Sequence, residues 1–284
     1  MEPVPRSVVA NGLSHHVLEW DGGGPSTVLC LHGFLDRSWA YHRVAPALAA
    51  AGHHVVAPDL RGHGETERVG PGGYYYFLDY LLDLADLVDA LARDELNLVG
   101  HSMGAAVAGY YAGTFPSRVA RAALLERPRL PDTPLASVPE RTAAWIAGAR
   151  RARLATPRVH PTLAEAARRI RERDPRCPEE EALFLARHGT RPVAGGFAFL
   201  HDPLHLTRGP YPFRAEVAAA YWSAIRCPLL LLDGEEGSPV PDDPLARTEA
   251  FRTARRVVVE GAGHMLLRHR PAEVARLLLR FLAE

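Results

Sequence analysis

The sequence predicts an α/β fold in which a doubly wound, mostly parallel sheet carries a mainly helical insertion. Short, mainly apolar runs, such as residues 27–31 and 96–99, are typical of strands buried on both faces of a sheet. Between such runs lie longer segments with apolar residues at helical spacing, such as residues 75–93. Strands that alternate with helices in this way predict parallel pairing. The alternation stops at Pro128 and resumes near residue 227, which indicates an insertion.

The first part of the core, residues 1–128, is expected to alternate between strands and helices. Expected strands cover residues 15–20, 27–31, 54–58, 96–99 and 119–125, and expected helices cover 38–51, 75–93 and the segment from 105 onward. The helix over 75–93 places most of its leucines on or near one face, as a helix packed on a sheet requires. Ligands of such sheets bind at the carboxyl ends of the strands, so functional residues are expected there.

The remaining chain divides into the insertion, residues 129–226, and the second part of the core, residues 227–284. Helices are expected at 139–154, 162–173, 178–187 and 215–225, with a non-helical segment at 193–200. The core then resumes with strands at 228–232 and 256–259 and a closing helix at 272–282. A helical block inserted at this point is expected to form a lid over the site.

The charge composition argues against nucleic acid as a partner. The chain has 284 residues and a formal net charge of zero, and all 33 of its basic residues other than histidine are Arg. Without a basic stripe, nucleic acid is not an expected partner. The exclusive use of Arg fits a GC-rich coding bias. We expect a monomer or homodimer that acts on a small molecule.

Cysteine use and hydropathy bear on the compartment. Cys30, Cys177 and Cys227 are too few and too scattered for a disulfide framework or a zinc site. No apolar stretch has the length of a signal peptide or a membrane span. We therefore expect a cytoplasmic protein without a membrane partner.

Residues 96–104 carry the strongest functional signal. An apolar strand ends in Gly100-His101-Ser102-Met103-Gly104 and passes directly into a helix of small residues. This order of strand, tight turn and helix is the context of a nucleophile elbow, in which the flanking glycines avoid collisions in a strained turn. Ser102 is therefore the candidate nucleophile.

A serine nucleophile needs a base and an oxyanion hole. His264, in the glycine-rich segment that follows the last strand, is the candidate base, with His269 as a competitor one turn further on. The backbone amide of Met103, directly after the nucleophile, is expected to be one oxyanion donor. The amide of Phe34, in the loop after the strand at 27–31, is expected to be the other, since Gly33 allows that loop to approach the serine.

Four motifs in order resemble the α/β-hydrolase superfamily. They are His32-Gly33-Phe34, the loop at 59–64, the elbow at 100–104, and Gly263-His264. The segments 31–36 and 186–190, with Phe197, Phe199 and Asp202-Pro203, are similar to the serine hydrolase-like proteins of that superfamily. The resemblance implies a lidded serine hydrolase without a cofactor. Dehalogenases and epoxide hydrolases of the superfamily have Asp at the nucleophile position, where this chain has Ser102.

The third member of the triad departs from the usual pattern. Most members of the superfamily carry an Asp after the penultimate strand, and the corresponding position, three beyond Gly234, is Gly237. A second known location is the end of the strand after the nucleophile helix, which is Glu126 here. We therefore expect Glu126 to orient His264. The alternatives are the acids near Gly234: Glu235, Glu236, Asp242 and Asp243.

The substrate pocket is expected near these residues and beneath the lid. Candidate lining residues are His32, Gly33, Trp39, His101, Trp145, Phe197, Phe199 and Trp222, although the aromatic ones could equally form core. His201 and His205 are four apart, but Pro203 argues against a helix there, so no metal is expected.

The expected function is a cofactor-independent serine hydrolase that cleaves a small or medium carboxylic ester, thioester or lactone through an acyl-enzyme. The alternatives are lyase or carbon–carbon bond cleavage chemistry with the same serine and histidine, or a ligand-binding protein with reduced turnover.

Overall fold

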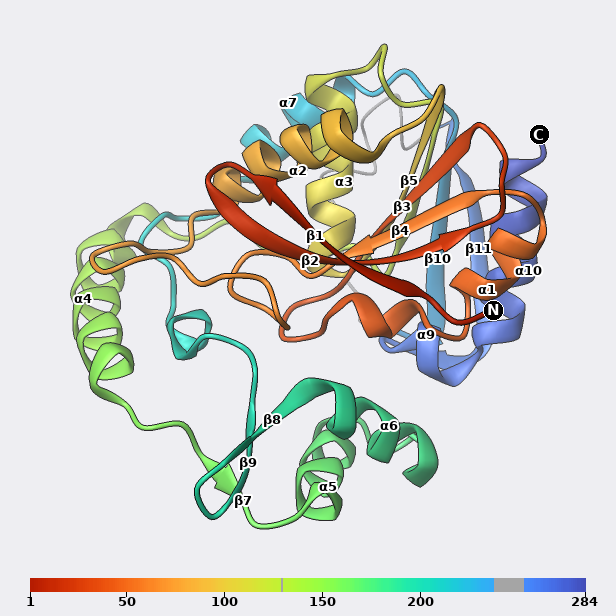
Figure 1. Cartoon of the computed structure of the whole chain (residues 1–284). Coiled ribbons are helices and arrows are strands. Elements are labelled where there is room, and N and C mark those ends of the chain that lie inside the picture. The colour runs from red at the N-terminus through yellow and green to blue at the C-terminus, as the bar shows by residue number, and fades with distance from the viewer. Residues whose placement is uncertain (129, 238–252) are drawn as a thin grey trace.

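A computed structural model of the chain describes residues 1–128, 130–237 and 253–284 and contains one large sheet of eight strands (Figure 1). The strand order is β1-β2-β4-β3-β5-β6-β10-β11. The strands are β1 (Val4–Ala10), β2 (Leu13–Asp21), β3 (Ser26–Leu31), β4 (His54–Pro58), β5 (Glu95–His101), β6 (Arg121–Leu125), β10 (Leu229–Glu236) and β11 (Arg255–Gly263). Only the pairings of β2 with β1 and β4 are antiparallel. The predicted mostly parallel sheet is therefore confirmed, with β1 as an edge strand that the sequence analysis did not identify.

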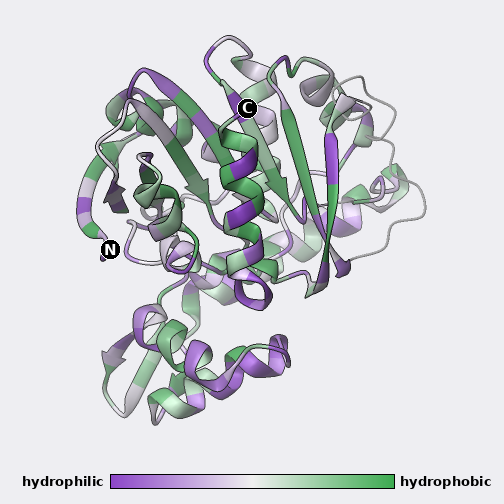
Figure 2. Ribbon diagram, turned by 90° about the vertical axis from the view of Figure 1, so that its right-hand side faces the viewer, coloured by the Kyte–Doolittle hydropathy of each residue, from purple (hydrophilic) through white to green (hydrophobic). Residues whose placement is uncertain are grey.

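Helices cover both faces of this sheet. Successive residues of β3 show why, because Leu29 and Leu31 join one hydrophobic cluster whereas Val28 and Cys30 join another on the opposite face. The first cluster packs beneath α2 (Phe77–Leu91) and α3 (Met103–Thr114), and the second beneath α1 (Ala45–Ala50) and α10 (Pro271–Leu282). In Figure 2, α10 alternates between hydrophobic and hydrophilic residues in front of strands that are mostly hydrophobic. This is the pattern of a helix with one buried face.

The segment expected to be one helix over residues 38–51 is divided into two pieces. A 3₁₀ turn, η1 (Ser38–Tyr41), comes first, and α1 follows only at Ala45. Pro46 stands in the first turn of α1, where its missing amide hydrogen costs no helical hydrogen bond.

The last helix of the predicted insertion, α7 (Ala215–Ser223), packs against α3 of the core. The Trp222 ring lies directly over Gly109, where a Cβ would come within 2.8 Å of the ring, and Tyr221 stacks on Tyr110 with ring centroids 4.3 Å apart. By its packing, α7 therefore lies with the core helix α3, although it falls within the segment predicted as the insertion. Trp222 is 2% exposed and is a core residue, which corrects its assignment to the substrate pocket.

The insertion forms a lobe that extends from the left of the large sheet to below it in Figure 1. Its helical pieces are η2 (Leu135–Ser137), α4 (Val138–Leu154), α5 (Leu163–Arg173), α6 (Glu179–Gly189) and η3 (Pro203–Leu206). The expected non-helical segment becomes part of a small antiparallel sheet of β7 (Val159–His160), β8 (Thr190–Val193) and β9 (Gly196–Phe199). Packing of α5 on α6 gives this lobe a small core of its own, centred on Ala166, Ala182 and Leu185.

Charged contacts join this lobe to the segment after β11. Asp174, directly after α5, accepts a hydrogen bond from His269 Nε2 at 2.9 Å and lies 3.6 Å from Arg268 Nη1. Arg268 also donates to Asp36 Oδ2 at 2.7 Å. Both Asp174 and Asp36 are buried, and a buried carboxylate is costly unless a charged or hydrogen-bonding group pairs with it. The contacts with Arg268 and His269 provide such partners. These contacts position the lobe beside the carboxyl ends of the strands.

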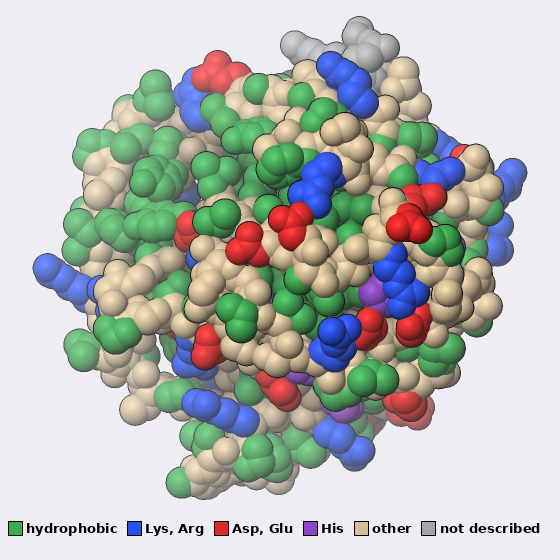
Figure 3. Space-filling model, turned by 45° about the horizontal axis from the view of Figure 1, so that its top comes forward, with side chains coloured by type: hydrophobic (Ala, Val, Ile, Leu, Met, Phe, Trp, Pro, Cys, Tyr) green, Lys and Arg blue, Asp and Glu red, His purple; other side chains and the backbone are tan. Residues whose placement is uncertain are grey.

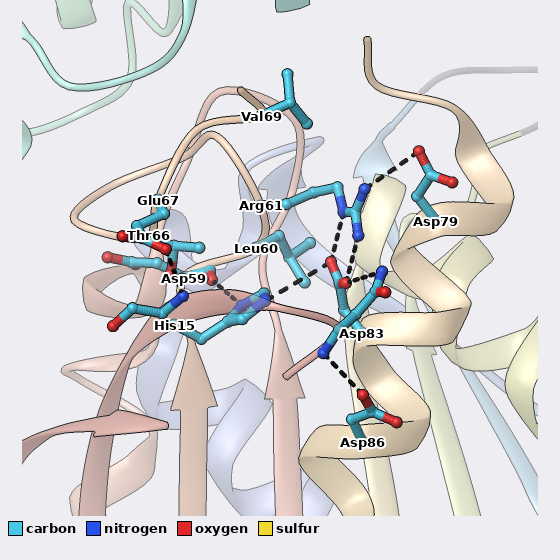
Figure 4. A network of polar contacts seen from close by, with 12 residues as sticks. His15, Asp59, Leu60, Arg61, Thr66, Glu67, Val69, Asp79, Asp83 and Asp86 are labelled. Carbon is cyan, nitrogen blue, oxygen red and sulfur yellow. Dashed lines mark hydrogen bonds and ion pairs between the residues drawn. The ribbon is translucent and has the colours of Figure 1, made fainter. Parts of the chain in front are cut away.

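A second polar network fixes the loop after β4 (Figure 4). Arg61 forms a two-point contact with Asp83 of α2, and its Nη1 lies 3.1 Å from Asp79 Oδ2. His15 Nε2 of β2 lies 3.7 Å from the same Asp83, which is fully buried. Asp59 accepts hydrogen bonds from the Ser38 amide at 2.7 Å and the Glu65 amide at 2.9 Å. The polar residues of the motif at 59–64 therefore have a structural role, since they hold the loop after β4 in place.

The surface mixes charges of both signs. On the face shown in Figure 3, Arg side chains are interspersed with Asp and Glu side chains. Among the described residues, no helix combines the length and the apolar character that crossing a bilayer requires.

Candidate active site

Ser102 stands on a sharp turn between β5 and α3. Its φ is 50°, an uncommon value for a residue with a side chain. A Cβ at Gly100 would overlap the Gly104 carbonyl, and a Cβ at Gly104 would overlap the Leu31 carbonyl of β3. The two glycines are therefore required for the turn and for close packing of α3 on the sheet. Strain of this kind is typical of a nucleophile elbow.

His264 follows β11 and points to the serine. Its Nε2 lies 3.1 Å from Ser102 Oγ, and its Nδ1 lies 3.1 Å from Glu126 Oε2. The backbone carbonyl of His264 accepts a hydrogen bond of 2.8 Å from His101 Nε2, which ties the histidine loop to the elbow. The His264 side chain is 43% exposed, so a substrate can reach it from solvent.

Glu126, the residue after β6, is held rigidly by the neighbouring strand β10. It is 2% exposed and has a φ of 48°. Its amide donates to the Leu232 carbonyl at 2.8 Å, and its Oε1 accepts from the Gly234 amide at 2.6 Å. Oε2 is directed at His264. One carboxylate oxygen is thus anchored to the sheet, and the other orients the imidazole.

The other candidate acids and the competing histidine lie elsewhere. Glu235 accepts a hydrogen bond from the Gly261 amide at 2.9 Å, and Glu236 pairs with Arg176 at 2.8 Å. Asp242 and Asp243 lie outside the described residues. His269 accepts from the Gly263 amide and contacts Asp174, so it faces away from Ser102. Of the described candidates, only Glu126 contacts His264.

The loop after β3 lies close against the elbow. A Cβ at Gly33 would come within 2.9 Å of His101 Nδ1 and 3.3 Å of Ser102 Cβ, so only glycine allows this approach. Among the described residues, neither the Phe34 amide nor the Met103 amide donates a hydrogen bond. Both donors are therefore available to an oxyanion beside Ser102.

Two buried histidines support this arrangement from beneath. His32 donates from Nδ1 to the Gly33 carbonyl at 2.7 Å and accepts at Nε2 from the Leu60 amide at 2.9 Å. Burial lowers the pKa of His32, and burial together with the nearby His264 lowers the pKa of His101 to about 4. Both rings are therefore neutral near pH 7 and act as fixed hydrogen-bonding groups. His32 and His101 are 0% and 1% exposed, so they lie behind the site and not on a pocket wall.

A cavity of about 450 Å³ lies between the core and the inserted lobe. Phe34 of the oxyanion loop and Met265, the residue after His264, line it together with Phe199 of β9. Of the aromatic residues predicted for the pocket, Phe199 lines this cavity. The cavity has the size of a site for a small organic ligand.

The other predicted pocket aromatics do not line this cavity. Trp39 packs against Phe184 and His188, with ring centroids 5.5 and 4.0 Å apart, and Trp145 packs against Tyr74 at 5.4 Å. Phe197 is likewise absent from the cavity wall. Trp39 and Trp145 therefore pack within the inserted lobe and at its contact with the core. No pattern in the sequence distinguishes an aromatic residue packed in this way from one that lines a pocket.

Comparison with known proteins identifies the family of this chain. The family model described as "alpha/beta hydrolase fold" matches residues 26–270. A "Serine hydrolase-like protein" of Danio rerio is 28% identical over 278 residues, which cover 91% of this chain and 83% of the relative. An "Epoxide hydrolase" of Caballeronia sordidicola is 41% identical over 98 residues, which cover 34% of this chain and 29% of that protein.

Solved structures agree with the family model. A structure described as "Thioesterase Domain From Curacin Biosynthetic Pathway" superposes with a TM-score of 0.87 at 27% sequence identity and covers 99% of this chain and all of that one. The resemblance to the α/β-hydrolase superfamily and to its serine hydrolase-like proteins is thereby confirmed. The chain belongs to the alpha/beta hydrolase fold family and is a hydrolase.

Proposed function

We propose that the protein is a serine hydrolase that cleaves a carboxylic ester, thioester or lactone through an acyl-enzyme on Ser102. The observation that carries this proposal is the continuous contact from Ser102 through His264 to Glu126, with both nitrogen–oxygen distances at 3.1 Å. A nucleophile, a base and an orienting acid in hydrogen-bonding reach form the arrangement that activates a serine hydroxyl.

The proposed reaction follows from these contacts. His264 is protonated on Nδ1, facing Glu126, so that Nε2 accepts the Ser102 proton as Oγ attacks the carbonyl carbon. The Phe34 and Met103 amides stabilise the oxyanion that forms. His264 then protonates the leaving alcohol or thiol. A water molecule, activated by the same histidine, hydrolyses the acyl-enzyme and regenerates the serine. Apart from the substrate and one water molecule, every step uses only groups of this chain.

Epoxide opening fits the site less well, although some relatives are named epoxide hydrolases. Attack of Ser102 on an epoxide carbon would give an alkyl ether of serine. An ether has no carbonyl carbon that water can attack, so the intermediate could not be hydrolysed by an oxyanion-hole mechanism. Ser102 therefore favours acyl transfer.

A fluorophosphonate probe tests the proposal directly, because it phosphonylates only an activated serine. We expect covalent labelling of the wild-type protein on the peptide that contains Ser102, together with hydrolysis of p-nitrophenyl butyrate. Ser102→Ala should abolish both without loss of the folded state. A folded wild-type protein that is neither labelled nor active towards such esters would refute the hydrolytic mechanism and favour a ligand-binding role.

A further inference from the structure

The wall of the cavity beside the triad is rich in arginine. Six arginines and two aspartates line it: Arg37, Arg68, Arg158, Arg169, Arg173 and Arg268, with Asp36 and Asp174. The sequence analysis did not identify these arginines, because no local pattern distinguishes them from solvated surface residues. Only the fold brings them to one cavity.

Three of these six arginines lie near an acidic side chain. Arg268 contacts both lining aspartates, at 2.7 Å and 3.6 Å. Arg37 is buried next to Asp36 and donates to the Leu185 carbonyl at 2.9 Å. Arg169 pairs with Glu172 at 2.6 Å. These three arginines therefore have structural roles or neutralised charges.

The other three arginines have no such partner. Among the residues that the structure describes, no carboxylate lies within 4 Å of Arg68, Arg158 or Arg173. Arg68 donates only to the carbonyls of Leu200 and His201, at 3.1 and 3.4 Å. The three come from separate segments, namely the β4–α2 loop, the residue before β7 and the end of α5. Their charges are thus available to a ligand in the cavity.

Two histidines on the same wall have pKa values that burial and these arginines lower. Burial, and then Arg173, Arg37 and Arg68, lower the pKa of His201 to about 4, against a smaller opposing effect of Asp202. Burial and then Arg158 lower the pKa of His160, with Arg169 acting in the same direction and Glu165 and Glu172 opposing. Both rings are neutral near pH 7 and add hydrogen-bonding capacity without charge.

Apolar residues occupy the rest of the wall. Phe34, Met265, Ile170, Phe199 and Leu206 contribute apolar surface. A ligand that fills the cavity therefore contacts Phe34 of the oxyanion loop, Met265 next to His264, other apolar side chains, and guanidinium groups without a carboxylate partner. Arginine is well suited to bind carboxylate, phosphate and sulfate groups, because its planar donors match their oxygens.

We propose that this cavity is an anion-binding subsite, in which Arg158, Arg173 and Arg68 bind a carboxylate, phosphate or sulfate group of the substrate. The inference rests on the proposed function and assigns to it a substrate class: esters or thioesters that carry a negative charge away from the scissile carbonyl. The charged group belongs either to the acyl part or to the leaving group, and the two possibilities require different substrates to tell apart.

Two matched pairs of substrates test the proposal. The first pair is the mono-p-nitrophenyl ester of adipic acid and the corresponding ester of adipic acid monoamide, which differ in one charge on the acyl part. The second pair is S-butyryl-4′-phosphopantetheine and S-butyryl-pantetheine, which differ in one phosphate of the leaving group. The comparison is made for wild type, Arg158→Gln, Arg173→Gln and their double variant. Arg168→Gln, on the same helix as Arg173 but outside the cavity wall, is the matched control.

We expect the wild-type protein to have a higher kcat/KM for the charged member of one pair. Each single substitution should reduce this preference about 3-fold, and the double substitution should reduce it about 10-fold. The loss should appear mainly in KM, because the contact is made equally in the ground state and the transition state. The preference should also fall in 0.5 M NaCl, which provides a test on the unaltered protein. Arg168→Gln should retain the wild-type preference.

The outcomes separate this inference from the proposed function. Equal turnover of charged and neutral members of both pairs, or a preference that the double variant and salt leave unchanged, overturns the subsite while hydrolysis by Ser102 stands. Failure of wild type to cleave any of the four substrates and to react with the fluorophosphonate probe overturns the hydrolytic mechanism, and the subsite with it.

Discussion

The carboxylate of Glu126 occupies the space that a side chain at Gly237 would fill. A Cβ built on Gly237 would overlap Glu126 Oε1 and lie 2.9 Å from its Cδ. The two residues follow neighbouring parallel strands, in which Leu125 of β6 pairs with Leu232 of β10. Gly237 is also the position at which the family resemblance implies an Asp. An acid on either strand can therefore reach the same place beside the histidine, and here the longer Glu side chain comes from β6.

We expect Glu126→Gln to lower kcat by about 10³- to 10⁴-fold, since an amide cannot stabilise the imidazolium that forms during catalysis. The Gln carbonyl oxygen can still accept the hydrogen bond from the Gly234 amide, so the fold should be preserved. Ester hydrolysis and thermal melting measured on the same preparation check both points. Glu235→Gln and Glu236→Gln are the controls and should keep near-normal turnover, because neither side chain contacts His264. The opposite pattern would place the acid at the end of β10.

Moving the acid across the sheet should restore part of this loss. In the double variant Glu126→Gly/Gly237→Asp, glycine accepts the φ of 48° at 126, and removal of the Glu126 side chain vacates the space for the introduced carboxylate. The Gly234 carbonyl, 2.9 Å from the Cβ position, must shift slightly. We expect kcat at least about 10-fold above that of Glu126→Gly alone. Equal activity of the single and double variants would show that the two positions are not interchangeable.

The oxyanion loop should be sensitive to a single methyl group. In Gly33→Ala the new Cβ would meet His101 Nδ1 at 2.9 Å and Ser102 Cβ at 3.3 Å, so the loop that carries the Phe34 amide must move away. Loss of one oxyanion donor costs about 10²- to 10³-fold in kcat. Gly70→Ala, where the Cβ meets nothing within 4 Å, is the control and should leave kcat unchanged. Unchanged kcat in Gly33→Ala would show that the Phe34 amide is not a donor.

The sequence predicted those parts of the site that depend on local pattern. The strand–turn–helix order placed Ser102 at the elbow, and the glycine-rich segment after the last strand placed His264 on the same edge of the sheet. The prediction of Glu126 required knowledge of the two positions that the triad acid can take in the superfamily. The proximity of Glu126 to His264 depends on β6 and β10 being neighbours, which no local pattern shows. The cavity wall was not predictable, since Arg68, Arg158 and Arg173 converge only through packing of the inserted lobe.

The fold shows the same division between local and tertiary signals. Buried parallel strands have mainly apolar runs and were identified, whereas β1 is largely exposed and was missed. Helix α7 carries a helical pattern that the sequence shows clearly, but only its contact with α3 reveals that it packs on a core helix. Trp222 and Trp145 illustrate the limit for side chains, because an aromatic residue in a core and one in a pocket have the same local pattern.

Buried neutral histidines should make the protein unstable towards acid. His101, His201 and His205 each have a pKa lowered to about 4, with burial as the main cause. In the unfolded chain these groups titrate near 6.5, so between pH 6.5 and about 4 the unfolded state binds more protons than the folded state. The stabilising contribution is therefore complete above pH 6.5 and is lost as the pH falls, by at most about 1.4 kcal/mol per pH unit for each histidine.

The contribution of one of these histidines can be isolated by substitution. His205 stacks on Tyr75 with ring centroids 3.9 Å apart, and its Nε2 donates to the Arg61 carbonyl at 3.2 Å. In His205→Gln an amide hydrogen can still be donated, but no group titrates. We expect the free energy of unfolding, measured in urea, to fall less steeply from pH 6.5 to 4.5 than in wild type, by up to about 1.4 kcal/mol per pH unit. The comparison uses the slopes, because the substitution also changes stability at pH 7. Identical slopes would mean that His205 is protonated equally in the folded and unfolded states.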